Sequence, residues 1–365
     1  MEWLTKIAPG YGPDGTPLLS VLCKRTYVFA NGKVAEPDAS SQIPFHDIDA
    51  FLDEGDPLKN APKAEAEGIA YKPLTDVILH ASAYAPRGNQ ANHLDVGIMV
   101  GGYRKIVRVF GNRKVVVQGM GFTFSPPEPF ASMRLDYSRA YGGKDAKSLP
   151  GVEYAYAKNP LGKGFMVKND PALLQGMALP NLEDPNRLLT PDTLVLGKYE
   201  NWGRQPDPCS FGYAPRNAFP RLAQAGLSHP DRIDAEADRR MRLQDMAEIG
   251  AAGQREPPAP MPLLNPEFFN GAPPGLKLPY LKGDETIKLR YLDPDHPAFE
   301  FKLNPEKPSP CLDVGEGRMA LPATLQTLEI YKATNQYTVV WRGSVKYQGP
   351  QSLKLFTKFE FGVMP

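Results

Sequence analysis

Histidine, cysteine and carboxylate side chains are the groups that would hold a metal ion in this chain. Its five histidines are His46, His80, His93, His229 and His296. His80 and His93 lie in or beside neighbouring β segments, close in sequence to Asp76 and Asp95, so they could form a two-histidine site. An ordinary hydrogen-bonded or surface histidine pair explains the same residues. The chain contains neither HExxH nor H-x-E with CxxC, and we expect no metal site.

Nucleophilic and phosphate chemistry have no recognisable motif either. The chain lacks a GxSxG elbow, and none of its cysteines stands in the sequence context of a known nucleophile. Adjacent carboxylates such as Glu183 and Asp184 are common on solvated surfaces. The segment AKNPLGKG (157–164) resembles a Walker A loop, but it lacks the first glycine and has Gly164 where Ser or Thr binds magnesium. We expect no catalytic residue and no cofactor.

The cysteines and the charge balance bear on compartment and partners. Cys23, Cys209 and Cys311 are widely spaced and odd in number, which predicts free buried thiols in a reducing compartment. The 42 basic and 41 acidic residues leave a formal charge of +1, without the basic excess typical of nucleic-acid binders. No leader and no apolar stretch of about 18 residues is evident. We expect a cytoplasmic protein that binds neither nucleic acid nor membrane.

Alternation of apolar and polar residues predicts strands at both ends of the chain. Such runs occur at 94–100, 104–110, 114–118, 287–291, 299–303, 337–341 and 353–361. Residues 111–113 are predicted to form a hairpin-type link between two of these runs. A period of two indicates one buried and one wet face, and the 39 prolines favour short strands with structured loops. The predicted fold is mainly β, or α+β, with antiparallel sandwich-like sheets around a core that includes Trp341.

The middle of the chain has a different pattern. Residues 137–221 are rich in Gly, Pro, Asn and aromatics, which predicts a long ordered excursion of loops and short strands. A 3.6-residue period over 231–249 predicts one notable helix, and a Pro-rich connector follows at 251–262. We divide the chain into an N-terminal β region (1–136), the loop-rich middle (137–228), helix and connector (229–262) and a C-terminal β region (263–365). One compact unit overall is the alternative.

Four aromatic residues gather near the end of this loop-rich middle: Trp202, Phe211, Tyr213 and Phe219. Because aromatic residues are enriched at interface hot spots, one hypothesis is that these four form an exposed patch that binds a partner protein. The other interpretation, which we favour, is that they are plugs that keep long loops ordered.

An ordered series of short motifs resembles one bacterial family. In chain order they are KPLTDV (72–77), HASAYAP (80–86), LDV (94–96) with Gly101 and Gly102, RVFG (108–111), PEPF (127–130), YSRAYGG (137–143), NPLGKGF (159–165), LPNLE (179–183), NPEFFNGAPP (265–274), LKGDE (281–285) and WRG (341–343). Together they are similar to a domain-of-unknown-function family encoded beside type VI secretion effectors. The resemblance covers roughly residues 4–343.

The motif residues themselves indicate architecture. Gly142, Gly143, Gly162 and Gly164 suit positive φ or close backbone approach, and Asn159 and Asn181 stand beside prolines in predicted turns. Arg139 and Tyr141 suit a buried corner in which the guanidinium binds loop carbonyls.

The family's members are described as accessory proteins, so the resemblance implies an effector adaptor or chaperone and not an enzyme. Such an adaptor would bind the spike-tip-like domain of a toxic effector and help load that effector onto the secretion spike. A carbohydrate-active or other β-sandwich enzyme is one alternative. A structural component of the secretion apparatus is another.

Overall fold

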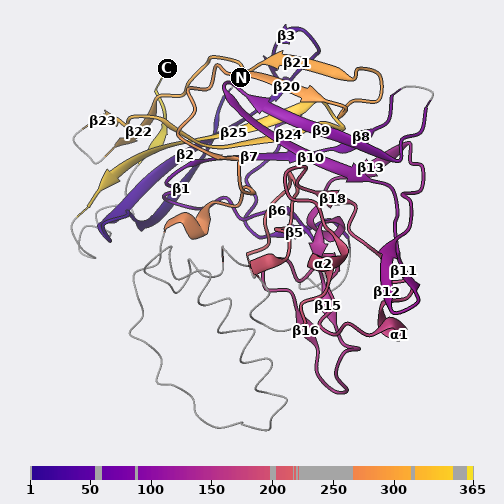
Figure 1. Cartoon of the computed structure of the whole chain (residues 1–365). Coiled ribbons are helices and arrows are strands. Elements are labelled where there is room, and N and C mark those ends of the chain that lie inside the picture. Colours follow the sequence, from indigo (N-terminus) through magenta and orange to yellow (C-terminus); the bar gives the residue numbers. More distant parts are fainter. Residues whose placement is uncertain are drawn as a thin grey trace, which may run out of the picture.

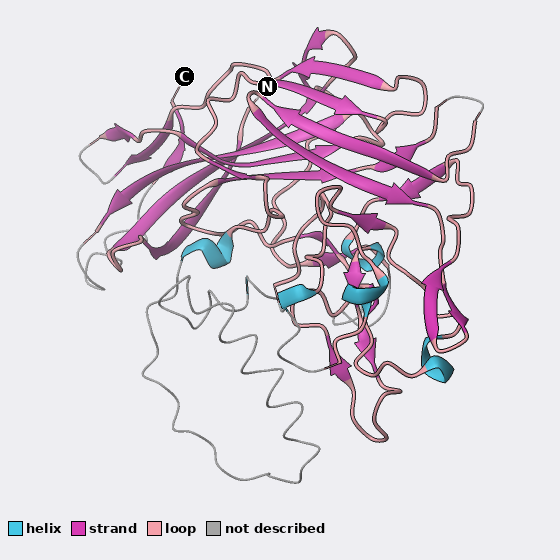
Figure 2. Cartoon of the chain, in the orientation of Figure 1, coloured by secondary structure: helices cyan, strands magenta, loops and turns pink. Residues whose placement is uncertain are grey.

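A computed structural model describes residues 2–53, 60–86, 89–197, 203–216, 218, 221, 266–313, 317–347 and 360–364. The chain is mostly β, with 43% strand and 6% helix, which confirms the predicted class. Figures 1 and 2 show two large sheets, with smaller sheets and short helices beside them. The predicted helix at 231–249 and the connector at 251–262 lie outside the described residues.

The larger sheet has seven strands drawn from both ends of the chain. Its order is β1 (Leu4–Tyr11), β2 (Pro17–Val28), β25 (Gln336–Lys346), β24 (Thr324–Tyr331), β7 (Thr75–His80) and β19 (Lys277–Leu278), and β4 (Glu36–Pro37) pairs with β2. Neighbours are antiparallel except β24 and β7, which are parallel.

The second sheet has six strands in the order β18 (Leu182–Glu183), β10 (Tyr103–Phe110), β9 (His93–Val100), β20 (Thr286–Arg290), β21 (Ala298–Lys302) and β3 (Lys33–Val34). Its neighbours are antiparallel except β21 and β3.

Alternating apolar residues from the two sheets meet in one hydrophobic cluster. Val21 of β2 and Trp341 of β25 belong to it with Ile98 of β9 and Phe301 of β21. Phe29 joins the layers, because its ring centroid lies 3.9 Å from that of Phe301 and 6.3 Å from that of Tyr337. The sheets therefore form a sandwich, and Trp341 is in its core as predicted.

The loop-rich middle contains short paired strands and has its own apolar cluster. The small sheets, in the middle and elsewhere, are β5 (Ala50–Phe51) with β6 (Pro62–Ala64), β8 (Ser82–Tyr84) with β13 (Ser132–Arg134), β11 (Val115–Gln118) with β12 (Gly121–Phe124), β14 (Tyr141–Gly142) with β17 (Lys163–Gly164), β15 (Lys144–Asp145) with β16 (Tyr154–Ala155), and β22 (Pro310–Asp313) with β23 (Arg318–Ala320) and β26 (Phe361–Val363). The short helices are α1 (Pro171–Leu174), α2 (Pro191–Leu194) and the 3₁₀ helices η2 (Tyr137–Arg139) and η5 (Pro266–Phe269). Tyr156, Phe165 and Leu194 lie at the centre of the second cluster. Figure 1 shows this region beside the sandwich.

Two further expectations concern the hairpin at 111–113 and the strand at 353–361. The hairpin predicted across residues 111–113 is wrong, because β10 pairs with β9 and β18, while β11 pairs with β12. The turns that form these hairpins lie at Gly101–Gly102 and Gly119–Met120. Of the run at 353–361, residues 353–359 lie outside the described residues, and β26 begins at Phe361.

The thiol prediction is confirmed, since Cys23, Cys209 and Cys311 are all free and buried. Burial raises the pKa of the Cys23 thiol to about 12. In the described part of the chain, no helix is long and apolar enough to cross a membrane.

Candidate functional site

The outer face of the seven-stranded sheet carries buried polar side chains where a wet face was expected. Lys24 of β2, Glu329 of β24 and Thr338 of β25 are at most 1% exposed. Described residues between 42 and 72 lie over this face: Lys24 donates to the Pro44 carbonyl at 2.9 Å, Ala70 accepts a hydrogen bond from Ser20 at 2.7 Å, and Ile69 accepts one from Gln326 at 3.2 Å. We call this buried face and the charged groups that cover it the polar layer. Its charges require partners, because an unpaired buried charge is costly.

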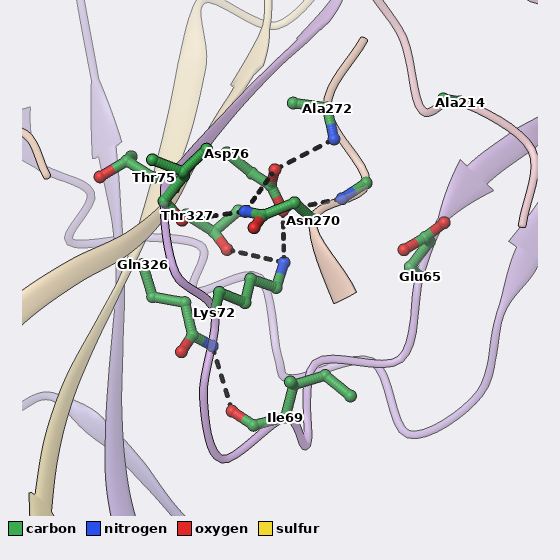
Figure 3. A network of polar contacts seen from close by, with 12 residues as sticks. Glu65, Ile69, Lys72, Thr75, Asp76, Ala214, Asn270, Ala272, Gln326 and Thr327 are labelled. Atoms are coloured by element: carbon green, nitrogen blue, oxygen red, sulfur yellow. Dashed lines mark hydrogen bonds and ion pairs between the residues drawn. The ribbon is translucent and has the colours of Figure 1, made fainter. Parts of the chain in front are cut away.

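Asp76, on β7, is the most fully satisfied group of the polar layer. Its carboxylate accepts four hydrogen bonds: from Lys72 Nζ at 2.7 Å, Asn270 Nδ2 at 3.0 Å, and the amides of Gly271 at 2.9 Å and Ala272 at 3.1 Å. Figure 3 shows Lys72, Asn270 and Ala272 converging on it from two separate segments. Burial alone would raise the pKa of Asp76, but Lys72 and these donors outweigh it and hold that pKa below its ordinary value.

The Asp76 contacts join two motifs that lie almost two hundred residues apart in the sequence. Lys72 and Asp76 belong to KPLTDV, whereas Asn270, Gly271 and Ala272 belong to NPEFFNGAPP. A third motif, WRG, joins them indirectly, because Arg342 donates to the Lys72 carbonyl at 3.3 Å. The polar layer thus fixes the loop at 270–274 to the sheet.

Arg221 and Glu65 form a second buried ion pair in the polar layer. Arg221 NH2 lies 3.0 Å from Glu65 Oε2, and NH1 bonds to Glu65 Oε1. The same guanidinium donates to the Phe268 carbonyl at 3.1 Å and to the Ala214 carbonyl at 2.7 Å. Arg221 is 2% exposed, so a single side chain joins residues 65, 214 and 268.

His80 and Glu329 lie where the polar layer reaches a surface cavity. His80 Nε2 lies 2.7 Å from Glu329 Oε1, and its ring stacks on Tyr331 with the centroids 5.0 Å apart. Burial opposes ionisation of Glu329, but the bond to His80 and nearby positive charge hold its pKa below the ordinary value. The His80 ring, Arg134, Asp293 and Lys332 line the cavity, whose volume is about 440 Å³.

The second group of motifs forms a backbone latch in the loop-rich middle. Asn159, fully buried, donates to the carbonyls of Tyr137 at 2.8 Å and Tyr141 at 3.1 Å. At Gly142, φ is 142° and a Cβ would lie 2.1 Å from the Asn159 carbonyl oxygen. A Cβ at Gly162 would lie 2.5 Å from the Ala140 carbonyl oxygen. The segments YSRAYGG and NPLGKGF therefore approach too closely for larger residues.

The other motif residues add to this latch. Gly143 and Gly164 also have positive φ, of 105° and 92°. Asn181 Nδ2 donates to the Phe110 carbonyl at 3.0 Å, which ties LPNLE to β10. The Tyr141 hydroxyl donates to the Leu194 carbonyl at 2.9 Å and accepts from Gln205 at 2.6 Å.

Arg139 does not make the contacts expected of it. Its side chain is half-buried, and NH1 donates to the Met133 sulfur at 3.0 Å, not to loop carbonyls. Its Nε has no hydrogen-bond partner among the described atoms. Asn159 and Asn181 take the role predicted for Arg139, since their side-chain amides donate to the carbonyls of Tyr137, Tyr141 and Phe110.

Of the two interpretations of the four aromatic residues, the favoured one, buried plugs, is confirmed for Phe211 and Tyr213, and the exposed patch is wrong for these two. Phe211 is 0% and Tyr213 is 3% exposed, and both belong to the sandwich core. They cannot be partner anchors, because side chains without exposed surface do not reach a partner. Trp202 and Phe219 lie outside the described residues.

The residues considered for chemistry lie apart or are paired within the chain. His80 bonds to Glu329, whereas His93 is exposed and its ring lies 6.1 Å from that of Phe110. Glu183 is buried against Arg113 and accepts from the Leu189 amide at 2.7 Å. Among the described residues, no group of three His, Cys, Asp or Glu side chains could hold a metal ion.

Sequence reasoning did not single out the buried charges as a site. Asp76, Lys72 and Asn270 stand inside motifs, but nothing in the spacing of these motifs shows that they meet. Glu65 and Arg221 stand in no motif, and their pairing depends entirely on tertiary structure.

The comparisons with known proteins give one family. The family model for DUF2169, described as "Uncharacterized protein conserved in bacteria", matches residues 14–342. The matched range runs from the turn before β2 into β25, so it includes the six-stranded sheet, the loop-rich middle and the seven-stranded sheet apart from β1 and the end of β25. The searches of curated proteins and of solved structures gave no match.

Proposed function

This chain belongs to the DUF2169 family of uncharacterized proteins conserved in bacteria, and we propose that it is an adaptor that holds another protein. In this proposal it binds a toxic type VI effector in the bacterial cytoplasm, through the effector's spike-tip-like domain. It then helps to load that effector onto the secretion spike. The link to type VI secretion rests on the motif resemblance described above.

One observation supports the proposal: the motif residues fix long loops to a rigid sandwich. Asp76 holds the loop at 270–274 through four hydrogen bonds, and Asn159 fixes the turn at 137–143. Loops held in one conformation lose little entropy on binding, so preorganisation favours a stable complex with a protein partner. Such a complex is expected to bury at least about 1,000 Å².

Co-purification tests the proposal directly. The tagged chain, expressed in its native host, is expected to recover the product of a neighbouring effector gene in a fixed molar ratio. Deleting the chain should lower effector abundance or delivery, while spike assembly continues. Recovery of no effector, or loss of the spike itself, would count against an adaptor; a symmetric oligomer of the purified chain would favour a structural component.

The cavity beside His80 favours an enzyme as the second candidate function. An imidazole oriented by a buried carboxylate, at the wall of a 440 Å³ cavity, is an arrangement that can move protons. The test is turnover of a glycan panel by the purified chain without any effector present. Turnover that disappears in His80→Gln would establish the enzyme and displace the adaptor.

A further inference from the structure

In the described part of the chain, the outer face of the six-stranded sheet carries exposed side chains, unlike the polar layer on the other sheet. Ile287 and Leu289 of β20 point into the core, whereas the intervening Lys288 and Arg290 are exposed. The same holds on β21, where Phe299 is buried and Ala298 is exposed. A groove with a volume of about 410 Å³ runs over β9, β10 and β20 on this face.

Gly97 makes the hollow of this groove. It lies opposite Ile106 of β10 on one side and Arg290 of β20 on the other, and it has no side chain to cover the sheet there. Met99, on the same face of β9, stands opposite Arg104 and Lys288. We call this surface the Gly97 groove; Met99 and Ile106 supply its apolar floor, and Arg104, Lys288 and Arg290 its rim.

The charge of the groove is predominantly positive. Against three basic residues, the lining contains one carboxylate, Asp95. That carboxylate is already bound by Arg108, whose Nε and NH2 lie 2.6 and 2.7 Å from its two oxygens. Lys288 has a partner in Glu300 at 3.0 Å, but both side chains are more than half exposed, so solvent screens the pair.

Backbone strain lies at one end of the groove. Tyr291, which lines it, has φ of 55°, a left-handed conformation that bulky side chains rarely adopt. Two backbone hydrogen bonds hold it there: its amide donates to Pro297 at 2.8 Å, and its carbonyl accepts from Tyr84 at 2.9 Å. Residues held in such conformations cluster at binding sites.

We propose that the Gly97 groove docks an acidic segment of the partner protein, with one apolar side chain of that segment seated in the hollow. The inference rests on the proposed adaptor function and names the surface that performs it. An apolar anchor in a small hollow, surrounded by complementary charge, is the usual construction of an interface hot spot. The basic rim selects carboxylates and rejects a basic segment.

A labelled peptide tests the groove itself. The probe is a fluorescein-labelled decapeptide with a central leucine flanked by glutamates, and its binding is followed by fluorescence anisotropy. We expect R104E/K288E to weaken binding about tenfold or more. The matched control, K33E/K147E, changes the net charge equally at exposed sites outside the groove and should bind as the wild type does.

Filling the hollow gives a second variant that leaves the charge unchanged. A Cβ at Gly97 would lie 3.1 Å from the Lys105 carbonyl oxygen and 3.5 Å from Ile106 Cγ1, so Gly97→Ala requires only a small shift. We expect it to weaken peptide binding several-fold while the urea unfolding midpoint stays close to that of the wild type. Unchanged peptide affinity in both variants would overturn the proposal.

Other occupants of the groove have distinct outcomes. Tighter binding of the matched lysine peptide, or of a single-stranded DNA decamer, would overturn the proposal, as would a dimer of the chain that R104E/K288E dissociates. In co-purification, equal recovery of the effector by wild type and R104E/K288E would exclude the groove but leave the adaptor function intact. Recovery by neither protein, with both folded, would contradict the adaptor function itself.

Discussion

Asp76 illustrates how a buried charge is retained in this fold. Removing an ion from water costs several kcal/mol, and a single counter-ion recovers that only with good geometry and further hydrogen bonds. Asp76 has all of these, since Lys72 and three amide groups fill its acceptor positions. Lys72 depends on Asp76 in turn, because Lys72 is only 7% exposed and water can replace little of the lost interaction. The pair contributes chiefly by fixing which loop docks where.

Replacing Asp76 with asparagine is therefore expected to lower the free energy of unfolding by about 3–5 kcal/mol. The amide keeps the shape but leaves the Lys72 ammonium without its charge partner and turns an NH₂ group towards other donors. Urea denaturation measures the change. Glu153→Gln, which breaks the exposed pair with Lys144, is the control and should cost about 1 kcal/mol or less. Equal effects of the two substitutions would show that the Asp76 network carries no special stability.

Asp293 makes a prediction about acid stability. Burial would raise its pKa, but Lys332 Nζ at 2.5 Å and the amides of Asp295 and His296 hold that pKa at about 2. Since the folded-state pKa lies below that of the unfolded chain, about 3.9, the stabilisation is complete above about pH 5 and is lost as pH falls towards 2. Asp293→Asn should reduce the loss of stability over that interval. The urea midpoint at each pH measures it, with exposed Asp284→Asn as the control.

At the scale of strands and loops, the sequence predicts what alternation controls. The runs at 94–100, 104–110, 287–291 and 299–303 all correspond to strands, because each buries one face in the sandwich. Strand pairing is harder to predict: residues 111–113 look like a hairpin turn, yet β10 pairs with β18, which begins only at Leu182. The sequence does not predict the polar layer, for a related reason. A strand covered by loops on its polar face has the same pattern as a strand in water.

The latch at Asn159 gives a prediction at this scale. In Gly162→Ala, the added Cβ would lie 2.5 Å from the Ala140 carbonyl oxygen and 2.6 Å from Asn159 Nδ2, so the two segments must separate. We expect a loss of about 2–3 kcal/mol, because the Asn159 bonds to buried carbonyls weaken as well. Gly121→Ala is the matched control, since nothing lies within 4 Å of its Cβ position. Thermal melting of both variants provides the comparison, and similar melting temperatures would contradict the latch.

At the scale of the whole molecule, long-range polar contacts tie the loop-rich middle and the chain ends into one structure. The two apolar clusters are separate, with Tyr156 in one and Trp341 in the other. Phe211 and Tyr213 of the middle pack in the sandwich core, and polar contacts add to this connection. Asn181 donates to Phe110 on β10, and Arg113 pairs with Glu183 on β18. The polar layer adds the third connection, through Arg221.

Arg221 provides the prediction at this scale, because it joins two distant segments, at Glu65 and Phe268, to the nearby Ala214. Arg221→Met should lower the free energy of unfolding by about 3–5 kcal/mol, since it leaves Glu65 deprived of its close partner and the Phe268 and Ala214 carbonyls unbonded. Glu65→Gln should have a similar effect, and the double variant should cost clearly less than the two combined, because each change has already broken the same pair. Urea denaturation of all three variants measures the coupling. Arg216→Met, half-exposed and 3.4 Å from Glu65, is the control and should cost about 1 kcal/mol or less. Additive effects of the two single changes would mean that Arg221 and Glu65 stabilise the fold independently. The contacts among residues 65, 221 and 268 would then not be cooperative, contrary to what the geometry indicates.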